Sequence, residues 1–160
     1  MPRSRSQVGR LSCRKGKVFE REVVRRFCAA GLPAERGYHQ ARGGHEECDV
    51  VVAWLWIECG HGASVTGEAK LKQAVRDEAA KRARIRDAGE PVSTRKLIPI
   101  AVTRRNGQRA VLATLRFGDL SRLIEHEELP NLDHDLPVTV ALSELLPLIA
   151  AWSAWRFANP

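Results

Sequence analysis

Residues 49–60 read DVVVAWLWIECG, and this apolar stretch decides the fold of the chain. Valine, isoleucine and tryptophan favour strands, and the run is too short for a confident helix, so it predicts β-structure. It is either one strand or two strands of a hairpin, because no Gly, Asn or Asp marks a turn near Ala53. Two acids, Asp49 and Glu58, flank this region, and acids are almost never buried unless they are paired or bound to a metal. Both are therefore candidates for a functional site.

Strand geometry predicts which side chains lie on the same face as Glu58. Side chains alternate between the two faces of a strand, so Trp56, Glu58 and Gly60 are expected to share one face, with Ile57 and Cys59 on the other. Two or three carboxylates suit a hard divalent cation such as Mg²⁺ or Mn²⁺. Beside a phosphate, such a cation neutralises developing charge and lowers the pKa of a bound water. The pattern is compatible with hydrolysis of a phosphodiester.

Helical and strand patterns surround this region in a fixed order. Residues 15–30 predict an amphipathic helix with Phe19, Val23 and Phe27 on its apolar side, ending near Gly31. Glu20 lies on the edge of that stripe, where a solvated flank is the simplest interpretation. The chain thus predicts an α/β or α+β domain with a central mixed β-sheet flanked by helices. The remaining predicted elements are a helix over 66–88 closing at Gly89, strands over 97–103 and 110–115 joined by a turn at Asn106-Gly107, and helices over 119–124 and 143–157.

The charge is unevenly distributed. The 160-residue chain carries a net charge of +7, with 24 basic against 12 acidic residues over 1–118 and 2 against 7 over 119–160. A basic body favours a polyanion such as nucleic acid. We expect a flexible basic arm over 1–14, a core domain over 15–124, and an acidic linker with a C-terminal apolar helix over 125–160. The acidic end is expected to face away from bound DNA.

The cysteines indicate the compartment. None of Cys13, Cys28, Cys48 and Cys59 forms a CxxC pair, which favours a reducing cytoplasm over a disulfide framework. No apolar stretch approaches the ~20 residues that a membrane span needs. A zinc site built from His45, Cys48, Cys59 and His61 is an alternative, although its second spacing is tighter than usual.

Five segments taken in order resemble the PD-(D/E)xK nucleases, and among them the archaeal and phage Holliday junction resolvases. The segment KGKVFERE is similar to the first helix of that family, and RGYHQARGGHEECDVVV to its glycine-rich loop and aspartate. LWIECGHG resembles the strand that ends in Glu-x-Lys, KLKQA the following helix, and IPIAVTRRN a later core strand. The similarity covers roughly residues 14–124.

The resemblance implies a homodimeric, Mg²⁺- or Mn²⁺-dependent endonuclease that cleaves branched DNA in a bacterial or phage-infected cell. It makes Glu20, Asp49 and Glu58 metal ligands, with the carbonyl of Cys59 as a further one. Gln73 is either a satisfied buried amide or a site residue. Basic and glycine residues near the site suit contacts to DNA phosphates. These are Arg14, Lys15, Lys17, Arg36, Arg42, Gly43 and Gly44.

One position departs from the family pattern. Gly60 stands where the family has its lysine, two residues after the second acid. One interpretation is that the amine comes from elsewhere, with Lys70, Lys72 or His61 as candidates, and Lys70 is the residue we assign a catalytic role. Alternatively, the protein is a catalytically impaired relative that binds DNA without cutting it, or the glycine is not the natural residue here. Glu68-Ala69-Lys70 also spells the motif, but its two charged residues point about 200° apart on a helix.

Overall fold

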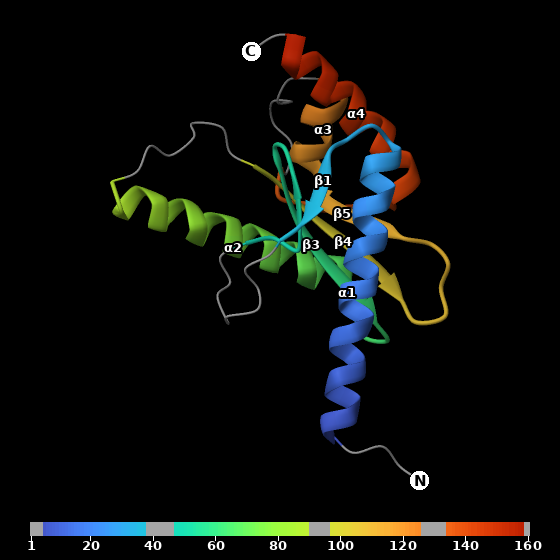
Figure 1. The fold of residues 1–160 in the computed structure, drawn as a ribbon. Helices are drawn as coiled ribbons and strands as arrows, with labels where there is room; N and C mark the ends of the chain where they lie inside the picture. Colours follow the sequence, from blue (N-terminus) through green and yellow to red (C-terminus); the bar gives the residue numbers. More distant parts are fainter. Residues whose placement is uncertain (1–4, 38–46, 90–96, 126–133, 159–160) are drawn as a thin grey trace.

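The computed structural model describes residues 5–37, 47–89, 97–125 and 134–158 (Figure 1). Its elements follow one another as helix, strands, helix, strands, and two helices separated by a last strand. They are α1 (Arg5–Ala29), β1 (Ala34–Arg36), β2 (Val50–Val52), β3 (Leu55–Gly62), α2 (Gly67–Asp87), β4 (Ile98–Arg105), β5 (Leu112–Arg116), α3 (Phe117–Glu125), β6 (Pro137–Ala141) and α4 (Leu142–Ala158).

The strands form one six-stranded sheet in the order β1-β2-β3-β4-β5-β6. Only β3 and β4 pair in parallel, and α2 makes the crossover between them. All other neighbouring strands are antiparallel. The predicted mixed sheet flanked by helices is therefore confirmed.

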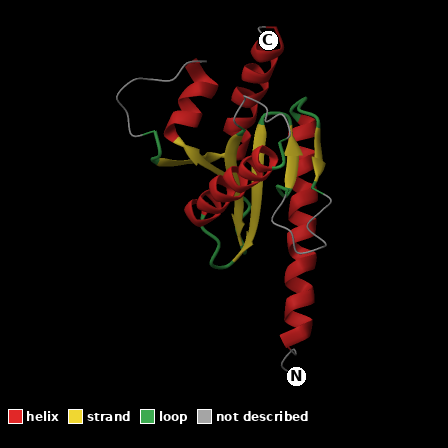
Figure 2. Ribbon diagram, turned by 90° about the vertical axis from the view of Figure 1, so that its left-hand side faces the viewer, coloured by secondary structure: helices red, strands yellow, loops and turns green. Residues whose placement is uncertain are grey.

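Helices cover the two faces of the sheet unequally (Figures 1 and 2). Helices α1, α3 and α4 contribute side chains to the main hydrophobic core on one face, while α2 lies alone across the other. Phe19, Val23 and Phe27 of α1 are buried in that core, as their spacing predicted. The face under α2 has only a small apolar cluster, made by Cys48, Trp56 and Ala74. Polar groups therefore occupy much of the α2 layer.

Helix α1 begins earlier than its sequence suggested. The flexible arm expected over residues 1–14 is wrong from Arg5 onward, because the helix starts there. Its N-terminal half extends past the sheet (Figure 1). The helix ends as predicted at Gly31, whose φ of 79° is left-handed. The Leu32 amide donates to the Phe27 carbonyl and the Gly31 amide to that of Cys28, which together close the last turn.

Several elements differ from the expectations. The run 49–60 is a hairpin whose reversal falls at Ala53 and Trp54, and Trp54 has a left-handed φ of 72°. Strand β6 lies within the stretch expected to be an acidic connection and a helix, and β1 within an expected loop. The buried side of α2 is formed by Leu71, Ala74, Asp77 and Glu78, whereas Ala69 and Ala80 are exposed.

Other expectations are confirmed. Gly107 has a φ of 78°, and the Gln108 amide donates to the Arg105 carbonyl in the turn that joins β4 to β5. Helix α4 packs into the main core through Leu145, Ile149 and Trp152, as the apolar residues of this segment favoured. Within the described residues, no helix is both long and apolar enough to span a bilayer.

The start of α2 is held close to the sheet. Thr66 caps the helix by accepting a hydrogen bond from the Ala69 amide. A Cβ added at Gly67 would collide with the side chain of Thr114 on β5. A glycine is therefore required where the first turn of α2 crosses β5.

Replacing Gly67 with alanine is expected to lower the free energy of unfolding by about 1–3 kcal/mol, because the helix must move away from Thr114. The matched change Gly16→Ala, in the interior of α1 with only Glu20 within 4 Å, should instead stabilise by about 1 kcal/mol. Urea unfolding followed by circular dichroism measures both. Equal effects of the two substitutions would show that the close approach at Gly67 is not a constraint.

Candidate metal centre

Asp49 and Glu58 face each other across the β2–β3 hairpin. Val50 pairs with Ile57, so continuing this register by one residue places Asp49 opposite Glu58. The Asp49 amide donates to the Ile57 carbonyl, and Asp49 Oδ2 accepts a 2.7 Å hydrogen bond from the Cys59 amide. Directly opposed residues of antiparallel strands point to the same face, with Cβ atoms about 5 Å apart. The two acids, both at least 90% buried, therefore form a pair.

Three donors surround the Glu58 carboxylate. Trp56 Nε1 donates to Oε1 at 3.3 Å from the same strand face, as the alternation predicted. Gln73 Nε2 donates to Oε2 at 3.1 Å from α2. Lys70 Nζ lies 3.7 Å from the same Oε2. Gln73, for which two interpretations were open, thus contacts the candidate site directly.

Lys70 occupies the space next to Gly60. A Cβ added at Gly60 would lie 3.3 Å from Lys70 Cγ and 2.8 Å from Val65 Cγ1. The absence of a side chain at position 60 therefore leaves room for the stem of Lys70. The other two candidates for the amine lie elsewhere: Lys72 is exposed and pairs with Glu68 at 2.8 Å, and the His61 ring packs 5.4 Å from that of Phe19 on the opposite face.

The environment of Glu58 raises its pKa from 4.5 to about 8. Burial is the largest cause, followed by the negative charge of Asp49, while Lys70 and the Trp56 hydrogen bond act in the opposite direction. Asp77 adds a further raising effect. The ionised form of Glu58 is therefore disfavoured by burial and by Asp49, and a bound cation would stabilise it.

Glu20 approaches from the other layer. It projects from α1, which covers the opposite face, and its Oε2 accepts a 2.8 Å hydrogen bond from Arg36 Nε of β1. Burial raises the pKa of the Cys59 thiol well above 9, and Asp49, Glu20 and Glu58 each raise it further. All three acids thus lie close enough to raise the pKa of the same thiol, but Glu20 also forms an ion pair with Arg36. Its role as a ligand stays a prediction.

The donor set suits Mg²⁺ or Mn²⁺. Within the ranges that the structure describes, no three His, Cys, Asp or Glu side chains are close enough together to hold a metal. Two buried carboxylates nevertheless fit Mg²⁺, since this ion keeps several waters and takes substrate phosphate oxygens. The residues present therefore fit a divalent cation held by two protein carboxylates.

The predicted zinc site is not supported. Cys59 belongs to the main core, whereas Cys48 belongs to the cluster under α2, on the opposite face of the sheet. The Cys48 thiol donates to the Val50 carbonyl at 3.1 Å, and burial raises its pKa to about 11. Two thiols on different faces cannot share one ion with ordinary Zn–S distances. His45 lies outside the described residues.

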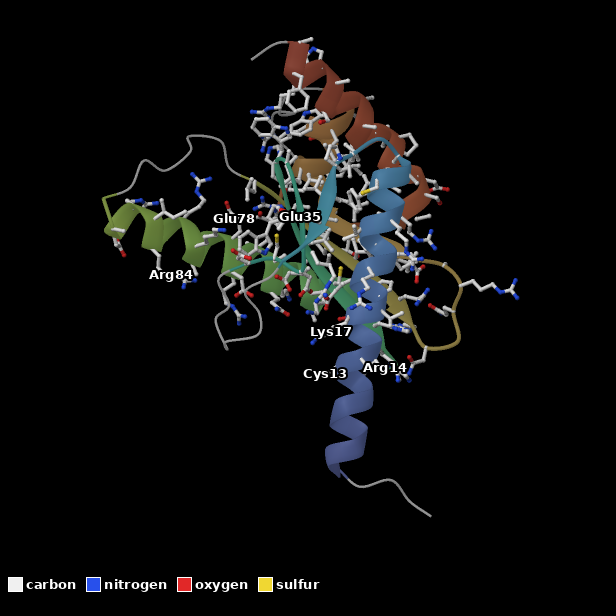
Figure 3. All side chains as sticks on the ribbon, in the orientation of Figure 1. Cys13, Arg14, Lys17, Glu35, Glu78 and Arg84 are labelled. Atoms are coloured by element: carbon white, nitrogen blue, oxygen red, sulfur yellow. The ribbon has the colours of Figure 1, made fainter. Side chains whose placement is uncertain are left out.

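The predicted DNA contacts divide into three groups. Arg14, Lys15 and Lys17 are exposed on α1, and Figure 3 shows Arg14 and Lys17 on the length of the helix that leads away from the sheet. Arg36 is held by Glu20 in its 2.8 Å ion pair. Arg42, Gly43 and Gly44 lie outside the described residues. The exposed α1 residues remain predicted contacts.

Asp77 is the site residue that sequence reasoning missed. It follows Lys70 and Gln73 at helical spacing, so the three lie on one side of α2. Its side chain is 7% exposed and accepts a 2.9 Å hydrogen bond from Arg76 Nε. Asp77 raises the pKa of Glu58. The signal in the sequence was a polar stripe, Lys70, Gln73 and Asp77, where an apolar one was sought.

Comparisons with known proteins find similarity among solved structures. No protein-family model and no curated protein sequence matches the chain. Among solved structures, the chain is similar to Hjc, a Holliday junction resolvase of the archaeal hyperthermophile Archaeoglobus fulgidus, at 16% sequence identity and a TM-score of 0.42. The similarity covers 82% of this chain and 95% of that one.

The raised pKa of Glu58 predicts a pH-dependent stability. The folded protein keeps a proton on Glu58 up to about pH 8, whereas the unfolded chain loses it near the ordinary pKa of 4.5. The free energy of unfolding therefore contains a contribution that falls as pH rises through this window, by at most about 1.4 kcal/mol per pH unit. Glu58→Gln should remove it, and the control Glu35→Gln, at an exposed position of β1, should not.

Urea unfolding of the metal-free protein at pH 5, 6, 7 and 8 measures this dependence. The difference in unfolding free energy between Glu58→Gln and the parent should grow with pH. Parallel curves for the two proteins would contradict the raised pKa.

Proposed function

We propose that this chain is a divalent-metal-dependent endonuclease in which Lys70 of α2 supplies the amine that Gly60 cannot. One observation carries the proposal: Lys70 Nζ lies 3.7 Å from the Glu58 carboxylate, and its stem lies against the space that a side chain at position 60 would need. The family that the sequence resembles brings its lysine to the second acid from the same strand. Here, the helix packed on that strand brings it.

Asp49 and Glu58 are the residues proposed to hold the cation, with the Cys59 carbonyl and Glu20 as further ligands. The cation would supply charge neutralisation at the scissile phosphate and a water of lowered pKa. The hydrogen bond from the Cys59 amide fixes the Asp49 carboxylate against β3. Trp56 and Gln73 hold the two oxygens of Glu58 from different elements. This arrangement orients both acids before any substrate arrives.

Lys70 has a distinct role in this proposal. The Lys70 side chain is 25% exposed, and its ammonium group lies near both Glu58 and solvent. It can therefore donate a hydrogen bond to an attacking water or to a phosphate oxygen while it remains close to the carboxylate. A fixed positive charge at this position stabilises the negative charge that develops on the phosphate during attack.

Branched DNA is the proposed substrate, and a homodimer the proposed active form. The support is the order of the five sequence segments that resemble Holliday junction resolvases, together with the basic charge of the chain before residue 119. A symmetric dimer would present two sites, one for each strand to be cut.

One observation favours a second candidate, a DNA-binding relative that does not cleave. Glu58, with a pKa of about 8, is protonated at neutral pH when no cation is bound. A cation must therefore displace this proton before Glu58 can act as a ligand. If cation binding cannot supply the free energy for this displacement, the protein binds DNA through its basic surface but does not cleave it.

Lys70→Ala should reduce cleavage of a labelled four-way junction in Mg²⁺ by roughly 10²–10³-fold, because a transition-state contact is lost. Lys72→Ala is the matched control, since this lysine is on the same helix, carries the same charge and is 76% exposed in the side chain. It should cleave within about twofold of the parent. Single-turnover rates on the junction and on linear duplex measure both variants and the substrate preference.

Gly60→Lys in the Lys70→Ala background provides the rescue. Removing the Lys70 side chain frees part of the space at position 60, and Val65→Ala frees the rest. Recovery of cleavage in this triple variant would support an amine that is interchangeable between strand and helix. Junction binding without cleavage by the parent, at every Mg²⁺ and Mn²⁺ concentration, would contradict the nuclease proposal and support the second candidate.

A further inference from the structure

A cavity with polar side chains in its wall lies on the α2 side of the sheet, near the ends of β3 and β4. Its volume is about 260 Å³, and it is enclosed by the start of α2, the ends of β4 and β5, and β6. Val65, Gly67 and Leu112 contribute to its wall. Its polar lining consists of Thr66, Thr103, Arg105, Gln108, Thr114 and Thr139. None of the described residues that line it is acidic.

The donors of this cavity are arranged for an anion. Thr103 is 5% exposed and lines the cavity, and its hydroxyl has no hydrogen bond among the described residues. The hydroxyls of Thr114 and Thr139 bond to each other at 2.9 Å, so one of them keeps a proton to donate. Arg105 is exposed at the cavity, and no described carboxylate pairs with it. A hydroxyl without a hydrogen bond, on a buried residue at the cavity wall and beside a guanidinium, is a favourable place for a phosphate oxygen.

The start of α2 adds to this arrangement. Gly67 is the first residue of the helix, and its missing side chain lets the backbone lie against Thr114. The amides of a first helical turn and the helix dipole both favour negative charge. Glu68, the acid of this turn, is held by Lys72 at 2.8 Å and does not line the cavity.

The cavity is a neighbour of the candidate metal centre. Gly60 pairs with Thr103 in the parallel register of β3 and β4, and Val65 touches both the cavity and the space at Gly60. Gly60 is two residues from Glu58 on the same strand face, which is about 7 Å along a strand. DNA rises about 3.4 Å per nucleotide along its axis, so this distance spans one to two nucleotides.

We propose that this cavity binds a backbone phosphate of the nucleic acid, one or two nucleotides from the phosphate at Asp49 and Glu58. The inference rests on the proposed function for the identity of the ligand, and on the cavity itself for the place of binding. The cavity fixes the register of the strand in the site, because Thr103 and Arg105 hold one phosphate while the metal centre acts on another.

Arg105→Gln tests the charge contact, with Arg109→Gln as its matched control. Arg109 is exposed on the same β4–β5 connection and does not line the cavity. Anisotropy of a fluorescein-labelled four-way junction, in EDTA and at several salt concentrations, gives the affinity and its salt dependence without cleavage. Arg105→Gln should weaken binding about tenfold and reduce the salt slope by about one, whereas Arg109→Gln should change affinity less than twofold.

Thr103→Val tests the buried hydroxyl, because it removes the donor and keeps the shape and charge. It should weaken binding several-fold with an unchanged salt slope, and Thr103→Ser should bind as the parent does. Equal losses for Arg105→Gln and Arg109→Gln, together with no effect of Thr103→Val, would overturn the proposal in favour of general surface charge.

Two further outcomes separate the causes of failure. If the parent cleaves junctions in Mg²⁺ but the Arg105 and Thr103 variants bind normally, the cavity proposal falls and the nuclease remains. If the variants lose affinity as expected and the parent never cleaves, the cavity proposal stands and the nuclease falls. A third outcome combines two results: a deoxynucleoside monophosphate shifts the amide resonances of Thr103 and Gly67, and Arg105→Gln leaves junction affinity unchanged. These results would overturn the cavity proposal in favour of a free-nucleotide site.

Discussion

The burial of one carboxylate, that of Glu58, is the constraint on which the rest of the site depends. Its side chain is 5% exposed between β3 and α2, next to a second acid, Asp49. A buried charge of this kind is costly unless donors or a cation compensate it. Trp56, Gln73 and Lys70 supply part of that compensation from two elements. Burial, followed by the negative charge of Asp49, accounts for the raised pKa of Glu58, and both effects favour the proposed binding of a divalent cation.

In the proposed site the amine comes from helix α2, and this origin determines which contacts position it. A lysine on β3 would be placed by the strand alone, whereas Lys70 is placed by the docking of α2 on the sheet. That docking depends on the close approach of Gly67 to Thr114 and on the cap at Thr66. The same approach forms one wall of the threonine-lined cavity. Helix docking, the amine and the cavity are thus parts of one arrangement on one face of the sheet.

Local patterns predicted much of the fold. The spacing of Phe19, Val23 and Phe27 identified the buried face of α1, and Asn106-Gly107 identified the β4–β5 turn. The turn at Ala53 and Trp54 could not be placed, because a left-handed tryptophan is rare and this one packs against Arg156 and Phe157 of α4. Strands β1 and β6 are edge strands of only three and five residues in the described part of the chain, so tertiary pairing decides them.

The candidate site was predictable only in part. Period-two alternation correctly placed Trp56 and Glu58 on one face of β3. The sequence alone left the choice among Lys70, Lys72 and His61 open. Their distances from Glu58 depend on how α2 packs on the sheet, and no local sequence pattern encodes that packing. Asp77 was missed because it is one of many charged residues on α2, and nothing in the sequence distinguishes a buried acid from an exposed one there.

Proton release on metal binding is the most direct test of the centre. Titration calorimetry of the protein with Mn²⁺ at pH 7, in buffers of different ionisation enthalpy, counts the protons displaced. With a Glu58 pKa of about 8, the account predicts that close to one proton leaves per ion and that Glu58→Gln abolishes the release. Failure of Mn²⁺ to bind, or binding without release of a proton in the parent protein, would contradict it.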